Sequence, residues 1–120
     1  MRVMVISAGN MPQVKDIEKS LDGYYKEIGC DVIDIVSRKI NGSWFDIIVD
    51  DEGLFKDPLV VTAVEKDGSP ALVGTLIICK FDGVDDVTDL EPGDAETISE
   101  AIALTVQNDE LQPVVVIEYQ

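Results

Sequence analysis

The sequence changes character at residue 81, where its most apolar segment meets a run of carboxylates. Residues 72–81, LVGTLIICKF, are rich enough in β-branched side chains to predict a buried strand in the middle of a sheet. Gly74 within this segment indicates a bulge or a close backbone approach. Residues 82–94, DGVDDVTDLEPGD, follow at once, and we expect them to face water. The chain must therefore fold around a central strand that ends in an exposed acidic loop.

Charge is distributed unevenly along the chain. It has 24 acidic and 9 basic residues, which gives a formal net charge of −15. All the basic residues lie within residues 1–80, whereas residues 81–120 hold eleven acidic residues and no basic one. A field of this sign repels nucleic acid and membrane surfaces and attracts basic proteins. We expect neither nucleic acid nor a membrane as a direct partner.

Length and composition predict one acidic domain that spans residues 1–120. With 46% hydrophobic residues, the chain is far from the disordered class. No apolar run approaches the roughly 18 residues of a membrane span. Cys30 and Cys79 stand apart in apolar surroundings, which favours buried, reduced thiols. There is no histidine, so mechanisms that need a histidine base or nucleophile partner are excluded, and we expect no cofactor and no metal.

The N-terminal region predicts a strand over residues 2–6 and then one long amphipathic helix. Apolar side chains recur at steps of three and four between Val14 and Ile28, with charged residues among them. Pro12 suits the first turn of a helix, and Gly29 is typical of its end. We therefore expect a single helix across this interval.

The middle of the chain predicts antiparallel strands. The Asn41–Gly42 turn would pair residues 31–36 with residues 44–50 as a hairpin. A further short strand is expected at residues 59–64, before the central strand. The Leu-Phe pair at residues 54–55 lies in the connection, and we expect both side chains to pack on the core.

The C-terminal third predicts a second helix and a last strand. Asp94 can cap a helix whose inner stripe continues to Thr105, with Glu96 and Glu100 on its outer face. Residues 113–119 then predict a buried strand. The expected fold class is α+β, a single domain with a mostly antiparallel sheet of five or six strands and two helices.

Several segments, in this order, resemble a known family. The chain has DIEKSL at residues 16–21, IG at 28–29, DIIVDDEGL at 46–54, LVGTLII at 72–78 and TDL at 88–90. This order resembles the small-protein family catalogued as domain of unknown function 3846, over residues 1–104. The acidic-acidic-glycine turn and the Val-Gly-Thr strand are the most specific parts of the resemblance.

The chain departs from the pattern of this family at two places. Gly29–Cys30 stands where two glycines are common, which affects only a tight turn, and Asp50 stands where asparagine is frequent, which adds a charge. The resemblance implies an origin in a bacteriophage or plasmid and a setting in the bacterial cytoplasm. It implies no catalytic residues, and we expect no enzyme.

Three segments invite other interpretations. Asp50, Asp51 and Glu52 carry oxygens that suit Mg²⁺ or Ca²⁺, but adjacent side chains at a turn diverge, so a charged hairpin tip is the better interpretation. Residues 82–94 lack the spacing of a helix-loop-helix calcium site. Residues 7–10 lie between a predicted strand and a predicted helix, yet they lack the glycine patterns that bind phosphate.

The excess of carboxylates leads to a binding hypothesis. Many negative surfaces serve only solubility, but eleven acids without one base exceed what solubility requires. We predict that the chain binds a basic nucleic-acid-binding host protein as a DNA mimic, and so inhibits a defence nuclease of the CRISPR or restriction type. The predicted contact residues are Asp82, Asp85, Asp86, Asp89, Glu91, Asp94, Glu96 and Glu100, with Asp50, Asp51 and Glu52 arranged beside Glu96 and Glu100.

Two other classes of function stay open. The chain can be a non-catalytic, homo-oligomeric interaction module in which Leu54, Phe55 and Leu59 form an exposed apolar patch at a homodimer contact. It can also be a Mg²⁺ enzyme that depends on carboxylates, the least favoured of the three. A strong dependence of binding on salt would favour the first hypothesis over the second.

Overall fold

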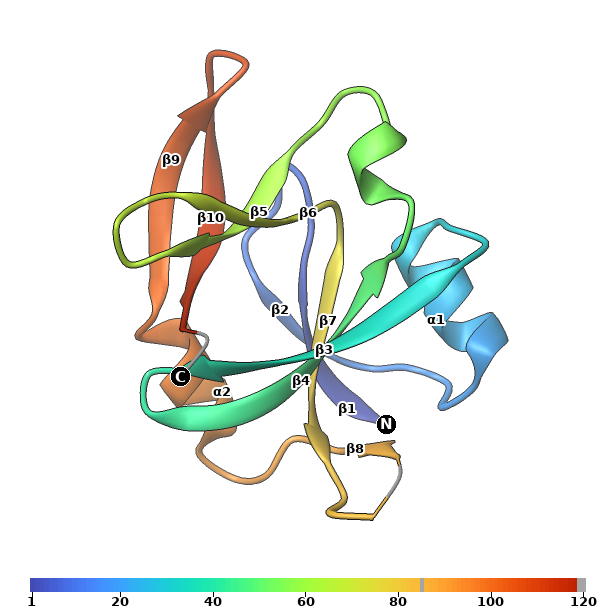
Figure 1. Ribbon diagram of the computed structural model, residues 1–120. Helices are drawn as coiled ribbons and strands as arrows, with labels where there is room; N and C mark the ends of the chain where they lie inside the picture. Colours follow the sequence, from blue (N-terminus) through green and yellow to red (C-terminus); the bar gives the residue numbers. More distant parts are fainter. Residues whose placement is uncertain (85, 119–120) are drawn as a thin grey trace.

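A computed structural model describes residues 1–84 and 86–118 of the chain (Figure 1). Over these residues the backbone forms two β-sheets, two short α-helices and one 3-10 turn. The fold is α+β with mostly antiparallel pairing, as the sequence predicts, but its strands are divided between two sheets rather than gathered in one. Within the described part of the chain, no helix is both long and apolar enough to cross a membrane.

The order of the strands defines the two sheets. The six-stranded sheet runs β2 (Gln13–Asp16), β1 (Arg2–Ile6), β7 (Leu76–Phe81), β4 (Ser43–Asp50), β3 (Ile33–Ile40), with β8 (Val87–Thr88) paired to β7. The four-stranded sheet runs β6 (Pro70–Val73), β5 (Val61–Glu65), β10 (Glu110–Ile117), β9 (Ile102–Gln107). The helical segments are α1 (Leu21–Ile28), the 3-10 turn η1 (Gly53–Phe55) and α2 (Asp94–Ser99). The pair of β5 and β10 is parallel.

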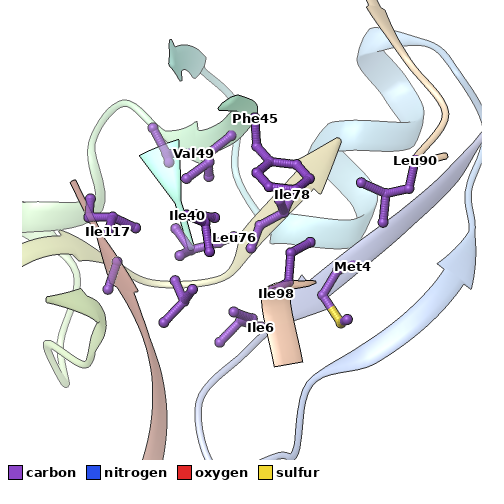
Figure 2. Packing of buried hydrophobic residues seen from close by; sticks show 13 residues of the cluster. Met4, Ile6, Ile40, Phe45, Val49, Leu76, Ile78, Leu90, Ile98 and Ile117 are labelled. Carbon is purple, nitrogen blue, oxygen red and sulfur yellow. The ribbon is translucent and has the colours of Figure 1, made fainter. Parts of the chain in front are cut away.

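The main hydrophobic core joins the two sheets. Figure 2 shows Ile6 and Ile78 from the first sheet, Ile117 from the second and Ile98 from α2 in one buried cluster. A smaller cluster covers the other face of the first sheet, where Tyr24 of α1 packs with side chains of β1, β4 and β7. Because these three strands have buried side chains on both faces, their sequences are apolar almost throughout.

The central strand predicted at residues 72–81 is in fact two strands, β6 and β7, which belong to different sheets. The chain turns between them at Gly74, whose φ of 73° lies in the left-handed region. The N–H of Gly74 donates to the carbonyl of Val60 (2.9 Å), and its carbonyl accepts from Oγ1 of Thr62 (2.6 Å). The predicted irregularity is thus the point where the chain passes from one sheet to the other.

The predicted helix from Pro12 to Gly29 is wrong in its first half. Residues 13–16 form β2, an exposed edge strand that pairs antiparallel with β1. Helix α1 begins only after Ser20, whose Oγ accepts a 3.0 Å hydrogen bond from the N–H of Gly23, and it ends at Gly29 as predicted. The apolar spacing predicted a helix for residues 13–16 because the local pattern does not reveal the hydrogen-bond partners that the open edge of β1 offers.

The predicted hairpin of residues 31–50 is confirmed. β3 and β4 pair antiparallel along their whole length, and the turn between them has positive φ at Asn41 (48°) and Gly42 (86°). Asparagine and glycine tolerate these left-handed conformations, which match the twist of the flanking strands. The local sequence signal therefore determines this part of the fold.

The C-terminal helix begins at Asp94 and ends at Ser99, but Gly93 and not Asp94 occupies the N-cap position. The residues predicted to continue it form β9, which makes a hairpin with β10. The turn of that hairpin has positive φ at Asn108 (52°) and Asp109 (63°). The strand predicted at residues 113–119 is confirmed as β10, which begins three residues earlier, at Glu110; residues 119 and 120 lie outside the described part of the chain.

Two expectations about exposure are reversed. Leu54 and Phe55, predicted to pack on the core, are 73% and 86% exposed in η1. Val87 and Leu90, which lie in the loop predicted to face water, are buried and belong to the two hydrophobic clusters. The acidic loop therefore has two apolar anchors that hold it against the protein, Val87 in the smaller cluster and Leu90 in the main core.

Candidate protein-binding surface

The region around β8 and the start of α2 holds most of the predicted contact residues. The backbone of Leu90 donates to the carbonyl of Arg2 (2.9 Å), and the Arg2 N–H donates to Oδ1 of Asp89 (3.0 Å). This stretch thus lies against the start of β1, at the lower end of the molecule in Figure 1. We call its exposed carboxylates, with those of Asp16 and Glu18, the acidic end; from this stretch they are Asp82, Asp86, Asp89, Glu91 and Glu96.

Aspartates build the loop between β7 and β8. Oδ1 of Asp82 accepts hydrogen bonds from the N–H groups of Val84 (2.8 Å) and Asp86 (3.2 Å). Oδ1 of Asp86 accepts from the N–H of Val87 (2.8 Å). Short acidic side chains favour such turns because they replace backbone acceptors. Two of the carboxylates predicted to bind a partner, those of Asp82 and Asp86, therefore also stabilise the turn. The predicted contact residue Asp85 lies outside the described residues.

Asp94 does not belong to the exposed surface. Its carboxylate is buried, lies 3.4 Å from Nζ of Lys80, and accepts a 2.7 Å hydrogen bond from the N–H of Glu91. The Nζ of Lys80 also stands 4.4 Å from the centre of the Phe45 ring. The prediction that Asp94 contacts a partner is wrong, because its charge is used within the fold to fix the start of α2.

Lysines engage two further predicted contact residues. Nζ of Lys56 lies 3.7 Å from Oδ2 of Asp50, whose side chain is only 7% exposed. Nζ of Lys19 lies 3.2 Å from Oδ2 of Asp86, and both side chains stay about half exposed. Asp50 is therefore withdrawn from the surface, whereas Asp86 remains accessible as part of a weak, solvent-screened ion pair.

The Asp50 to Glu52 tip does not stand beside Glu96 and Glu100, contrary to the prediction. The turn before β4 contacts α2, because Nδ2 of Asn41 donates to the carbonyl of Thr97 (3.3 Å) and to Oε2 of Glu100 (3.1 Å). From this turn, the eight residues of β4 extend about 23 Å to Asp50. Asp51 and Glu52 are exposed, but at the opposite end of this strand.

The C-terminal carboxylates are likewise scattered rather than gathered on one face. Asp109 and Glu110 lie at the β9–β10 turn, which projects at the end of the molecule opposite β8 (Figure 1). Glu118 pairs with Lys66, whose hydrogen bond lowers the pKa of this carboxyl. Glu100 faces the β3–β4 turn through Asn41. The negative surface is therefore smaller than the sequence total indicates.

The sequence analysis missed two members of the acidic end. Asp16 stands directly opposite Arg2 in the pairing of β2 with β1, and Glu18 follows two residues later; both are exposed. Ion pairing of the adjacent Lys19 with Asp86 ties this segment to the β7–β8 loop. The signal was hidden because residues 12–28 were interpreted as one helix, which would have carried these carboxylates away from β1.

A hollow of about 480 Å³ lies within the acidic end. Arg2, Leu90, Glu91 and Glu96 are among the residues that line it. The described residues contain no group of three or more histidine, cysteine, aspartate or glutamate side chains placed to hold a metal ion. Burial raises the pKa of the Cys79 thiol to about 12, so this thiol stays protonated and unreactive at neutral pH.

Comparison with known proteins decides the family. The model of the family described as domain of unknown function 3846 matches residues 1–103. The chain belongs to this family. No curated protein and no solved structure matches the chain. The match to domain of unknown function 3846 ends within β9, so β10, the strand between β5 and β9, lies outside the matched residues.

Proposed function

We propose that this protein is a non-catalytic module whose acidic end binds a basic, nucleic-acid-binding protein. The observation that carries the proposal is that exposed carboxylates from separate segments, β2 and its following loop, the β7–β8 loop and α2, lie at one end of the molecule. Basic residues also lie among these segments: Lys19 pairs with Asp86, Lys80 pairs with the buried Asp94, and Arg2 lines the hollow beside Glu91 and Glu96. A surface of this sign draws a basic groove toward it at long range.

The sharper form of the proposal is DNA mimicry in the bacterial host of a phage or plasmid. B-form DNA presents one charge per roughly 1.7 Å of axis, whereas carboxylates one helical turn apart are separated by about 6 Å. Helix α2 has only six residues and cannot supply that density alone. Mimicry therefore depends on the loop, helix and β2 side chains acting together, and its target would be a defence nuclease of the CRISPR or restriction type.

A pair of matched variants tests the proposal. In the first, four charges of the acidic end are removed by Asp16→Asn, Glu18→Gln, Glu91→Gln and Glu96→Gln. In the control, the same number of charges is removed elsewhere by Asp51→Asn, Glu52→Gln, Asp109→Asn and Glu110→Gln. Both proteins have the same net charge, so a difference in binding reports where the charges stand and not how many there are.

The measurement is a pull-down from a bacterial lysate with mass-spectrometric identification of what is captured. We expect basic nucleic-acid-binding proteins with the wild type and the control at low salt, and their loss with the acidic-end variant. At about 1 M salt, where the Debye length falls to about 3 Å, the wild type should also lose them. Equal capture by both variants, or capture that salt does not weaken, would contradict the proposal.

A second candidate function is supported by the exposed side chains of η1. Leu54 and Phe55 are exposed, and Leu59 beyond them is 45% exposed, so three large apolar side chains face solvent within six residues. A patch of this kind is typical of a protein contact. In this alternative the carboxylates only keep the protein soluble. Binding that persists at high salt and is lost with Phe55→Asp would favour it.

A further inference from the structure

β9 is an open edge of the second sheet. Among the described strands, it pairs with β10 alone. The carbonyl of Ala101, directly before β9, accepts a 2.8 Å hydrogen bond from the N–H of Val116. Because hydrogen-bonded and non-bonded pairs alternate along an antiparallel ladder, the backbone groups of Ile102, Leu104 and Val106 point away from β10. They form a row of donors and acceptors at the margin of the sheet.

This edge lacks the features that usually protect one. Its sequence, IALTVQ, has no charge, proline or glycine, and its pairing with β10 is regular at six successive positions. Natural sheets block such edges with lysine, proline or bulges, because an unprotected edge accepts another strand. Leu104 and Val106 are 59% and 72% exposed, and Leu111, opposite Val106, is 64% exposed on the same face. The edge therefore offers another strand both outward-pointing backbone groups and a stripe of exposed apolar side chains.

We propose that β9 pairs antiparallel with β9 of a second copy of this chain, across a two-fold axis at Leu104. In this register Leu104 stands opposite Leu104 of the partner subunit, and Ile102 stands opposite Val106 of the partner subunit. These are the residues whose backbone groups point outward, so each facing pair exchanges two hydrogen bonds. The two four-stranded sheets then form one sheet of eight strands.

The charge pattern favours a second copy as the occupant. Residues 101–108 carry no charge, although the whole chain has a net charge of −15. In the proposed register Glu100 faces Asn108 of the partner subunit, and Asp109 faces Ser99 of the partner subunit, so no like charges oppose one another along the strand pair. A basic strand would find no carboxylate on β9 to attract it. The neutral edge thus fits the neutral edge of another copy.

The proposal does not rest on the proposed function, and salt separates the two. Two chains of charge −15 repel each other, so screening should strengthen their pairing. A complex between the acidic end and a basic protein should instead weaken as salt rises. Each idea can therefore fail without the other.

Cysteine cross-linking tests the register directly. Hydrogen-bonded antiparallel residues have Cα atoms about 5.5 Å apart, which is within the range that a disulfide spans. Leu104→Cys should therefore give a covalent dimer on mild oxidation, whereas the similarly exposed Leu111→Cys should not. The native Cys30 and Cys79 are buried, so the wild type serves as the background. Cross-linking of Leu111→Cys as fast as Leu104→Cys would overturn the register.

Sedimentation equilibrium tests the association itself. Leu104→Pro removes only an outward N–H, and Leu104→Lys places two like charges at the axis; either should weaken the wild-type dimer at least about tenfold. The lysine variant keeps the test valid if the proline variant does not fold. A wild type that is monomeric at about 1 mM overturns the proposal. So does a dimer that Phe55→Asp breaks and Leu104→Lys does not.

Discussion

Asp94 illustrates how a carboxylate in an acidic segment can belong to the fold instead of the surface. Asp94→Ala removes the partner of the Lys80 ammonium and the acceptor of the Glu91 N–H, both of which lie in a half-buried setting. We expect the free energy of unfolding to fall by about 2 kcal/mol. Glu96→Ala, on the exposed side of the same helix, should change it by less than about 0.5 kcal/mol. Urea denaturation measures both, and equal losses would contradict the assignment.

Cys79 predicts a loss of stability at alkaline pH. Burial disfavours the thiolate, which raises the pKa of the folded thiol to about 12 from its usual 9.0. At a pH below the usual pKa, the Cys79 thiol is protonated in both the folded and the unfolded protein, and its contribution to the free energy of unfolding is complete. As the pH rises from there toward the folded pKa, the unfolded state loses its proton first, so unfolding becomes easier by roughly 1 kcal/mol per pH unit.

Comparison with Cys79→Val isolates this contribution. Denaturant unfolding of both proteins, at several pH values between about 8 and 11, should show a steeper decline for the wild type. Burial also raises the pKa of Tyr24 and of Cys30, but both residues are present in both proteins, so only the smaller contribution of Cys79 to the Tyr24 pKa does not cancel in the difference. Parallel declines would mean that the Cys79 thiol titrates alike in the folded and unfolded states.

At the scale of single elements, the sequence predicts those whose signal is local. The Asn41–Gly42 hairpin and the end of α1 at Gly29 depend on residues that sit in the turns themselves. β2 and β9 were predicted as helix, because their strand character depends on partners, β1 and β10, that the local pattern does not reveal. Tertiary hydrogen bonding prevailed over the apolar spacing in both cases.

Gly74 gives the element-scale prediction, because it separates β6 from β7. An added Cβ would meet no atom within 4 Å, so Gly74→Ala adds only the cost of holding alanine at a φ of 73°. We expect a loss of about 1 kcal/mol in the free energy of unfolding. Gly74→Asn, which also adds a Cβ, should lose less, since asparagine tolerates the left-handed region better. Thermal or urea unfolding of the two variants checks this order, and an asparagine variant less stable than the alanine variant would contradict it.

The candidate site was predicted only in part, for reasons that appear at the scale of the whole molecule. The sequence identifies every carboxylate, but it does not tell which ones a lysine from another element engages, as Lys80 does Asp94 and Lys56 does Asp50. It also does not show that the Asp50 to Glu52 tip and the β9–β10 turn project away from β8. Charge is read from composition, whereas the shape of a charged surface depends on long-range topology.

Gln112 links the two sheets. Its buried side chain accepts a 2.7 Å hydrogen bond from the N–H of Gly9 and donates to the carbonyls of Ser7 (3.2 Å) and Pro113 (2.8 Å). One amide on β10 thus satisfies the backbone of the turn after β1. The hydrophobic core also draws on both sheets, so we expect them to unfold together in one transition.

Gln112→Leu should therefore destabilise the whole molecule. It leaves the Gly9 N–H and the Ser7 carbonyl without this partner in a half-buried place, which should lower the free energy of unfolding by about 3 kcal/mol. Gln13→Leu, on the exposed β2, should change it by less than about 0.5 kcal/mol. Urea unfolding followed by Trp44 fluorescence reports the first sheet, and far-UV circular dichroism reports both. Because the sheets share one core, the two signals should coincide in the variant as in the wild type; separate transitions would mean that each sheet is stable without the other.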